Sequence, residues 1–250
     1  MTAPVGATAA DWLHFDQVLG LGADLLPVVP DPNARAAPYS AVSKFGKIPS
    51  VYDQEDQAHG LKEWQTREIT PAAVKHWSAD RRYSMCVRAS AARAIDVDID
   101  SNIRADDVLE TICDTLIDMG APCLPMRRRA NSAKFLMPFR LAGTWKKRRI
   151  IVHKEPLQAI EFLADGQQWV AAGSHPSGAL YEWRNGLPPD IPTLTAPQFE
   201  ELWRTLTEQY ALDPKLSTAT AEDTSASDDN LDGTVLSVID PDTLQRVKAA

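Results

Sequence analysis

Apolar residues recur at helical spacing in four segments of the chain, and this pattern predicts four helices. The predicted helices cover residues 9–22, 70–77, 104–119 and 195–210. Thr70 and Thr195 have the hydroxyl side chains that cap helix N-termini, and Gly120 is typical of a helix end. The segments lie well apart in the sequence, with extended runs between them.

Short apolar or alternating runs between these helices predict strands. The predicted strands cover residues 25–29, 93–99, 134–141, 149–153, 158–163 and 168–172. Helices and strands therefore intermix along the chain. This order favours a mixed α/β (α+β) domain over an all-α or all-β one.

All these elements fall within residues 9–212, which we expect to form one domain. Residues 213–233 are rich in Ser, Thr and Asp, and residues 217–233 carry five acids and no base. Such a composition is typical of a solvated linker. Residues 234–250 contain several apolar positions but are too few to form a core of their own.

Length and composition narrow the class of protein. A chain of 250 residues with 44% hydrophobic residues is ample for a sizeable core. No apolar run approaches the roughly 20 residues that span a bilayer, and the N-terminus lacks the features of a secretory signal. Cys86, Cys113 and Cys123 fit neither a disulfide framework nor a zinc-binding pattern. We therefore expect a cytoplasmic protein that does not contact membranes.

Charge is distributed unevenly along this acidic chain, whose net charge is −8. Residues 119–154 contain ten bases and no acid. A basic stretch in an acidic protein indicates a local site for a polyanion, and we favour a phosphate-binding surface over a merely solvated face.

Residues 93–99 alternate aspartate with apolar side chains. Because residues two apart in a strand share a face, Asp96, Asp98 and Asp100 are expected to line one side. Carboxylates this close repel each other unless a cation lies among them, and Mg²⁺ or Mn²⁺ is the natural partner of such oxygens. The alternative is an exposed edge strand whose polar face meets water.

A site for phosphoryl transfer also needs cations and often a further acid. The basic stretch supplies Arg127, Arg129 and Lys134. Glu161 lies within an apolar strand, where a charge is costly unless it is paired or metal-bound, so it is the candidate for the further acid. A place on the wet face of that strand is the alternative for Glu161.

Ser174 and His175 lie in a small-residue turn over residues 173–178. His175 is a candidate to bind a phosphate or a nucleotide hydroxyl, with a purely structural histidine as the alternative. No P-loop, zinc-protease or serine-hydrolase motif occurs in the chain.

Taken in order, these features resemble the bifunctional DNA primase/polymerase domain of the archaeo-eukaryotic primase superfamily, in its phage and plasmid form. The resemblance covers most of residues 12–186. Its motifs are Gly46-Lys47-Ile48-Pro49, Trp64, Ile69-Thr70-Pro71, Trp77, Ile95-Asp96-Val97-Asp98 and the most specific stretch, residues 165–176 followed by Tyr181-Glu182-Trp183.

The resemblance implies an RRM-like catalytic sheet and template-directed nucleotidyl transfer with Mg²⁺ or Mn²⁺. Asp96 and Asp98 match the first catalytic motif of the family, and Glu161 matches the third. The family usually has a histidine in its second motif, where this chain has Lys134. Either Lys134 or His175 would then contact the nucleotide phosphates, and whether Asp100 joins the metal site stays open.

We therefore expect a primase-polymerase catalytic domain over residues 9–212. Its expected catalytic and metal-binding groups are Asp96, Asp98 and Glu161, with His175 as a further catalytic candidate. Nucleotide binding is assigned to Arg127, Arg129, Lys134 and Ser174, and DNA binding to Lys146, Lys147, Arg148 and Arg149.

The expected partners are template and primer DNA, ribo- or deoxynucleoside triphosphates, and a C-terminal helical or helicase domain. Residues 240–247 resemble the opening of such a helical domain. A non-catalytic nucleic-acid-binding module of the same fold and a metal-dependent nuclease are the two alternatives. Tyr39, Tyr52 and Tyr83 are equal candidates for a residue that discriminates between sugars.

Overall fold

The structure is a computed structural model that describes residues 5–42 and 44–213. Of the predicted linker, residues 213–233, only Asp213 lies within this range, and the predicted segment 234–250 lies outside it. The described helices and strands all fall between Ala9 and Tyr210. None of these helices is long and apolar enough to cross a membrane.

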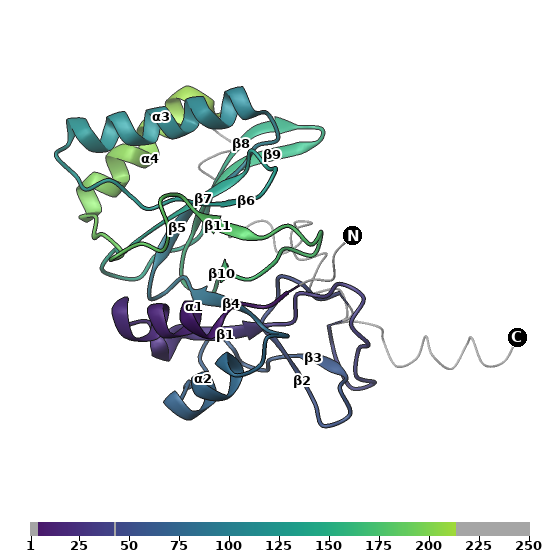
Figure 1. The fold of residues 1–250 in the computed structure, drawn as a ribbon. Helices are drawn as coiled ribbons and strands as arrows, with labels where there is room; N and C mark the ends of the chain where they lie inside the picture. The colour runs from purple at the N-terminus through teal and green to yellow at the C-terminus, as the bar shows by residue number, and fades with distance from the viewer. Residues whose placement is uncertain (1–4, 43, 214–250) are drawn as a thin grey trace, which may run out of the picture.

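A six-stranded sheet forms the centre of the molecule (Figure 1). Its strands lie in the order β11 (Tyr181–Trp183), β6 (Arg127–Arg129), β7 (Phe135–Phe139), β5 (Arg93–Asp98), β9 (Leu157–Leu163) and β8 (Arg148–Lys154). All neighbouring strands are antiparallel. Asp96 on β5 lies opposite Leu136 on one side and Glu161 on the other. The same row continues to Arg127 beyond Leu136 and to Arg149 beyond Glu161.

Helices α3 (Asn102–Asp118) and α4 (Ala196–Tyr210) cover one face of this sheet (Figure 1). Ser101 caps the first helix and Thr195 the second, so the predicted helices are confirmed to within a few residues. Ile95 and Val97 point from β5 into the core beneath the helices. Aromatic rings fill this core, and the centroids of Phe162 and Phe199 lie 4.2 Å apart. The helices thus fix which face of β5 is apolar.

A second layer, which the N-terminal part of the chain forms together with β10, packs against the other face. It contains a three-stranded sheet of β1 (Leu25–Val28), β4 (Ser84–Arg88) and β10 (Gln168–Ala172), helices α1 (Ala9–Leu13) and α2 (Pro71–Ser78), and the hairpin of β2 (Ser50–Tyr52) and β3 (Ala58–Gly60). Ala94, Leu136 and Leu163 of the large sheet belong to its hydrophobic core. The two parts therefore meet across the face that carries the aspartates.

The mixed α/β fold predicted from the sequence is confirmed, with differences in particular elements. The predicted helix over residues 9–22 is shorter: α1 ends at Leu13, and a π-helical turn, His14–Val18, follows, with the Leu19 amide bonded to the His14 carbonyl. Strands β2, β3, β4, β6 and β11 were not predicted. Strand β6 consists of three arginines, so it has no apolar alternation from which a strand could be predicted.

Candidate active site

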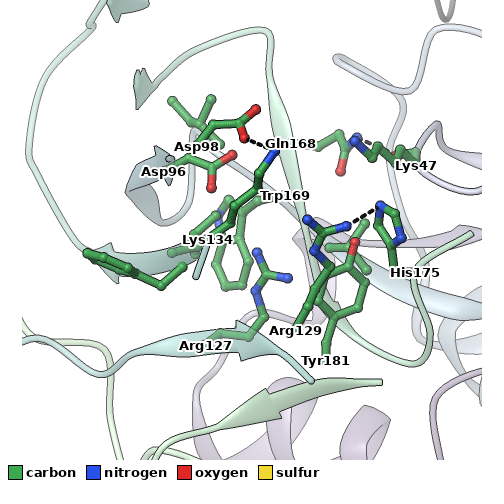
Figure 2. A pocket seen from close by; sticks show the side chains of 14 residues that line it. Lys47, Asp96, Asp98, Arg127, Arg129, Lys134, Gln168, Trp169, His175 and Tyr181 are labelled. Carbon is green, nitrogen blue, oxygen red and sulfur yellow. Dashed lines mark hydrogen bonds and ion pairs between the residues drawn. The ribbon is translucent and has the colours of Figure 1, made fainter. Parts of the chain in front are cut away.

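A cavity of about 400 Å³ lies between the large sheet and β10 (Figure 2). Acidic side chains from β5 and basic side chains from β6 and the loops face each other across it. Its lining residues are Lys47, Asp96, Asp98, Arg127, Arg129, Lys134, Phe135, Leu136, Leu163, Gln168, Trp169, Val170, His175 and Tyr181. Six of the predicted site residues are therefore brought to one cavity: Asp96, Asp98, Arg127, Arg129, Lys134 and His175.

Asp96 and Asp98 line this cavity from β5, as their spacing predicted. Within the described residues, the Asp96 carboxylate has neither a hydrogen bond nor an ion pair. Burial raises its pKa to about 6; the neighbouring Glu161 and Asp98 add to the rise, while Arg127 opposes it. A partly buried carboxylate without a partner, two residues from a second one, fits a hard cation such as Mg²⁺ or Mn²⁺.

Asp98 is already paired with a lysine. The Lys134 Nζ lies 2.5 Å from Asp98 Oδ1 and 3.0 Å from Asp100 Oδ1. Although burial opposes its charge, these two carboxylates raise the pKa of Lys134 above its usual value. Lys134 therefore lines the predicted nucleotide site, but it is directed at the acids (Figure 2).

Glu161 lies next to Asp96 across the sheet but does not line the cavity. Its Oε1 is 2.6 Å from Arg149 Nε and 3.0 Å from Lys147 Nζ. Although burial alone would raise it, these two cations hold the pKa of Glu161 below its ordinary value. In the described part of the chain, no three acidic, histidine or cysteine side chains gather around a ready metal position.

The three arginines of β6 alternate between the faces of the sheet. Arg127 and Arg129 point into the cavity, whereas Arg128 binds Asp106 of α3 on the opposite face, with 2.9 Å between Nη2 and Oδ1. The Arg127 guanidinium lies over the Tyr181 ring, 4.2 Å from its centroid. Two guanidinium groups thus face the acids of β5 (Figure 2).

His175 is held by Arg129, with 2.8 Å between the Arg129 Nη1 and the His175 Nε2. Because a guanidinium can only donate, Nε2 accepts this bond. The other ring nitrogen, Nδ1, lies 2.9 Å from the Ser177 hydroxyl and 3.1 Å from the Ser177 backbone N–H. Burial and the nearby cations, Arg129 first among them, lower the pKa of His175 to about 4. The neighbouring Ser174 side chain is buried and accepts from the Val5 amide, so it does not line the cavity.

Replacing His175 with Gln should change how stability depends on pH. The pKa of His175 is about 4 in the folded protein against 6.5 for the ordinary group, so the unfolded chain binds more protons between these values. Stability arising from this group is therefore lost as the pH falls below 6.5. Wild type should gain stability relative to the variant as the pH rises through this window, as measured by urea unfolding at about pH 4.5, 5.5 and 7.

A difference in stability between the two proteins that stays constant with pH would contradict the lowered pKa of His175. Asp96, which titrates in the opposite sense, is present in both and cancels.

Lys47, Gln168 and Tyr181 line the cavity although the sequence did not assign them a role there. Lys47 reaches it from the loop before β2, where Gly46 has a φ of 111° and its Cα packs against the Pro176 ring. A Cβ built on Gly46 would come within 2.2 Å of that ring, so only glycine fits this contact. Gln168 donates to the Lys47 carbonyl at 2.6 Å.

The missed residues had a partial signal in the sequence. Lys47 and Tyr181 both belong to motifs that carry the family resemblance. Tyr39, Tyr52 and Tyr83, the candidates for sugar discrimination, do not line the cavity, whereas Tyr181 does.

The four predicted DNA-binding residues do not share one face of the molecule. Lys147 and Arg149 contact Glu161, on the face that carries Asp96. Arg148 points the other way and binds Glu200 of α4, with 2.6 Å between Nη2 and Oε1. Lys146 precedes β8.

A comparison with protein families finds one matching family model, described as "Bifunctional DNA primase/polymerase, N-terminal", over residues 18–198. The match runs from the end of the π-helical turn into α4, so it includes every residue that lines the cavity. A search of curated proteins finds no match to the chain.

Proposed function

Because the chain belongs to the bifunctional DNA primase/polymerase family, we propose that this cavity catalyses template-directed nucleotidyl transfer with Mg²⁺ or Mn²⁺. The single observation that carries the proposal is the facing of two aspartates and two arginines across one cavity of nucleotide size. Both sets of side chains are needed: oxygens to bind divalent ions and cations to bind a triphosphate.

In the proposed reaction, a growing strand's 3′-hydroxyl attacks the α-phosphorus of a nucleoside triphosphate, and pyrophosphate leaves. We assign Asp96 and Asp98, with Glu161 behind them, to holding two divalent ions. Such ions, when bound, lower the pKa of the attacking hydroxyl and neutralise the leaving pyrophosphate. Asp96 would bind the divalent ion in its ionised form, because the positive charge of the ion lowers the pKa of Asp96 that burial has raised.

Arg127 and Arg129 are assigned to the triphosphate. Tyr181 keeps the Arg127 guanidinium in place by stacking, and neutral His175 accepts from Arg129, so both guanidinium groups are oriented before the nucleotide arrives. We keep His175 as a positioning residue for Arg129. Lys47, whose carbonyl accepts a hydrogen bond from Gln168, lines the same cavity and supplies a further positive charge.

The proposed setting is phage or plasmid DNA replication in the cytoplasm, as the resemblance of residues 165–183 suggests. The proposed partners are primer and template DNA and a C-terminal helical or helicase domain.

Template DNA is proposed to lie along the side of β8 that carries Lys147 and Arg149. Replacing Lys146 and Lys147 together with Ala should weaken DNA binding almost equally for all sequences. The slope of log affinity against log salt should fall by about one unit for each DNA phosphate that the variant no longer binds.

Arg148→Ala is the matched control for this DNA-binding experiment, because Arg148 binds Glu200 on the helical side. Fluorescence anisotropy at several salt concentrations measures both slopes. If the double variant has the same slope as wild type, DNA does not bind along this face of β8 and the proposed DNA-binding site is wrong.

Primer extension tests the proposed function directly. The full chain is incubated with a labelled primer on its template, Mg²⁺ or Mn²⁺, and either ribo- or deoxynucleotides. Extension supports the proposal, shortening of the primer indicates a metal-dependent nuclease, and a shift in mobility without either indicates a binding module.

A further inference from the structure

Lys134 makes a contact that a simple phosphate-binding lysine does not need. Its ammonium group bridges Asp98 and Asp100 at 2.5 and 3.0 Å, on the wall of the cavity that carries Asp96. Lys134 directly precedes β7, and Phe135 of β7 pairs with Val97 of β5, so the sheet register brings Lys134 beside Asp98 at the end of β5. A side-chain cation therefore lies beside Asp98, one of the carboxylates assigned to the metal ions.

The other two acids assigned to the metal ions, Glu161 and Asp96, differ in their ion-pair partners. Glu161 is bound by Arg149 and Lys147, while Asp96 has no partner within the described residues. A divalent ion arriving alone would find Asp96 and would have to displace Lys134 from Asp98. Mg²⁺ is commonly bound through one or two carboxylates together with substrate phosphates, so the nucleotide would complete the ligand set.

The Lys134 ammonium group also has a second possible partner in the same cavity, the triphosphate of a bound nucleotide. Arg127 and Arg129 mark the wall to which the triphosphate is assigned, and Lys134 lines the cavity with them (Figure 2). A nucleoside triphosphate carries more negative charge than Asp98 and Asp100 together, so its arrival draws the ammonium group away from the carboxylates. The flexible stem of lysine permits this movement without a change in the backbone.

We propose that Lys134 is an internal counter-ion that occupies Asp98 until a nucleotide binds, and that its transfer to the triphosphate opens the carboxylates to the divalent ion. Metal and nucleotide then bind with positive coupling, each tightening the other by the same factor. This inference rests on the proposed function, because it takes Asp96 and Asp98 as the metal ligands.

Mn²⁺ binding to the full chain, followed by electron paramagnetic resonance without nucleotide, tests the proposal. Lys134→Met should bind Mn²⁺ at least about fivefold more tightly than wild type, since the competing cation is gone. With a non-hydrolysable nucleoside triphosphate present, wild type should gain Mn²⁺ affinity more strongly than Lys134→Met does. Lys134→Arg, which keeps the charge, should stay close to wild type, and circular dichroism establishes that each variant is folded.

Arg128→Met is the control. It removes one positive charge from the strand between Arg127 and Arg129, but its side chain binds Asp106 on the opposite face of the sheet. Its Mn²⁺ affinity should stay within about twofold of wild type, because exposed ion pairs contribute little. An equal gain in Arg128→Met and Lys134→Met, or no gain in Lys134→Met, would overturn the proposal.

Failure of this inference is separable from failure of the proposed function. If Asp96→Ala/Asp98→Ala abolishes Mn²⁺ binding while Lys134→Met binds as wild type does, the ligand assignment stands and the counter-ion role is wrong. If Mn²⁺ binding survives the double aspartate change, the metal assignment itself is wrong, and the counter-ion role falls with it.

Discussion

Replacing Asp96 and Asp98 together with Ala should reduce nucleotide incorporation at least about a thousandfold, which corresponds to about 4 kcal/mol of transition-state stabilisation. The two carboxylates are the acids that line the cavity, and Asp96 has no other partner within the described residues. DNA binding should persist or strengthen, because removal of negative charge cannot weaken attraction for phosphate. Primer extension and anisotropy on the same preparation measure the two effects.

Asp106→Ala provides the control for this experiment. Like Asp98, Asp106 is an exposed aspartate paired with a cation, but it lies on α3, on the opposite face of the sheet from the cavity. Its loss should leave incorporation near the wild-type rate. Substantial extension by the double variant, or a comparable loss in Asp106→Ala, would show that the acids of β5 do not serve catalysis.

Replacing Arg129 with Met should raise the KM for nucleotide about tenfold to a hundredfold. A hydrogen bond to a charged group contributes about 1.5–3 kcal/mol, and each 1.4 kcal/mol is about a factor of ten in affinity. DNA affinity should change much less, because Arg129 faces the cavity and binds His175. Steady-state kinetics with varied nucleotide at saturating primer measures the effect.

Arg128→Met is the neighbouring control on the same strand. Its side chain binds Asp106 on the helical face, so its removal deletes one charge one residue away without touching the cavity. The KM for nucleotide should stay within about twofold of wild type, because exposed pairs contribute little. If both variants raise the KM equally, the effect is one of overall charge and the assignment of Arg129 fails.

The sequence was informative where local pattern and chemistry coincide. In β5 the alternation of aspartate and apolar residues predicted both the strand and the face that carries the acids. Thr70 and Thr195 predicted helix starts because capping depends on residues only three apart.

Other features depend on contacts between distant segments, and these could not be predicted. Arg127 and Arg129 form a strand only because β7 and β11 lie on either side of them. Lys47 reaches the cavity through the contact between Gly46 and Pro176, which are far apart in the sequence. The basic stretch was predicted to bind phosphate as a whole, yet strand alternation directs Arg128 and Arg148 to acids on the helices.

The central position of β5 has a consequence for how this protein can evolve. Ile95 and Val97 of this strand are enclosed by the core beneath the helices. On the opposite face, Ala94 packs into the other core, and Asp96 and Asp98 line the cavity. Both neighbours of the strand also pair with its backbone along most of this length. Inserting or deleting one residue there would exchange the two sets, burying carboxylates under the helices and exposing isoleucine to the substrate. Insertions and deletions should therefore be tolerated in the loops around the cavity, whereas the length and register of β5 should stay unchanged.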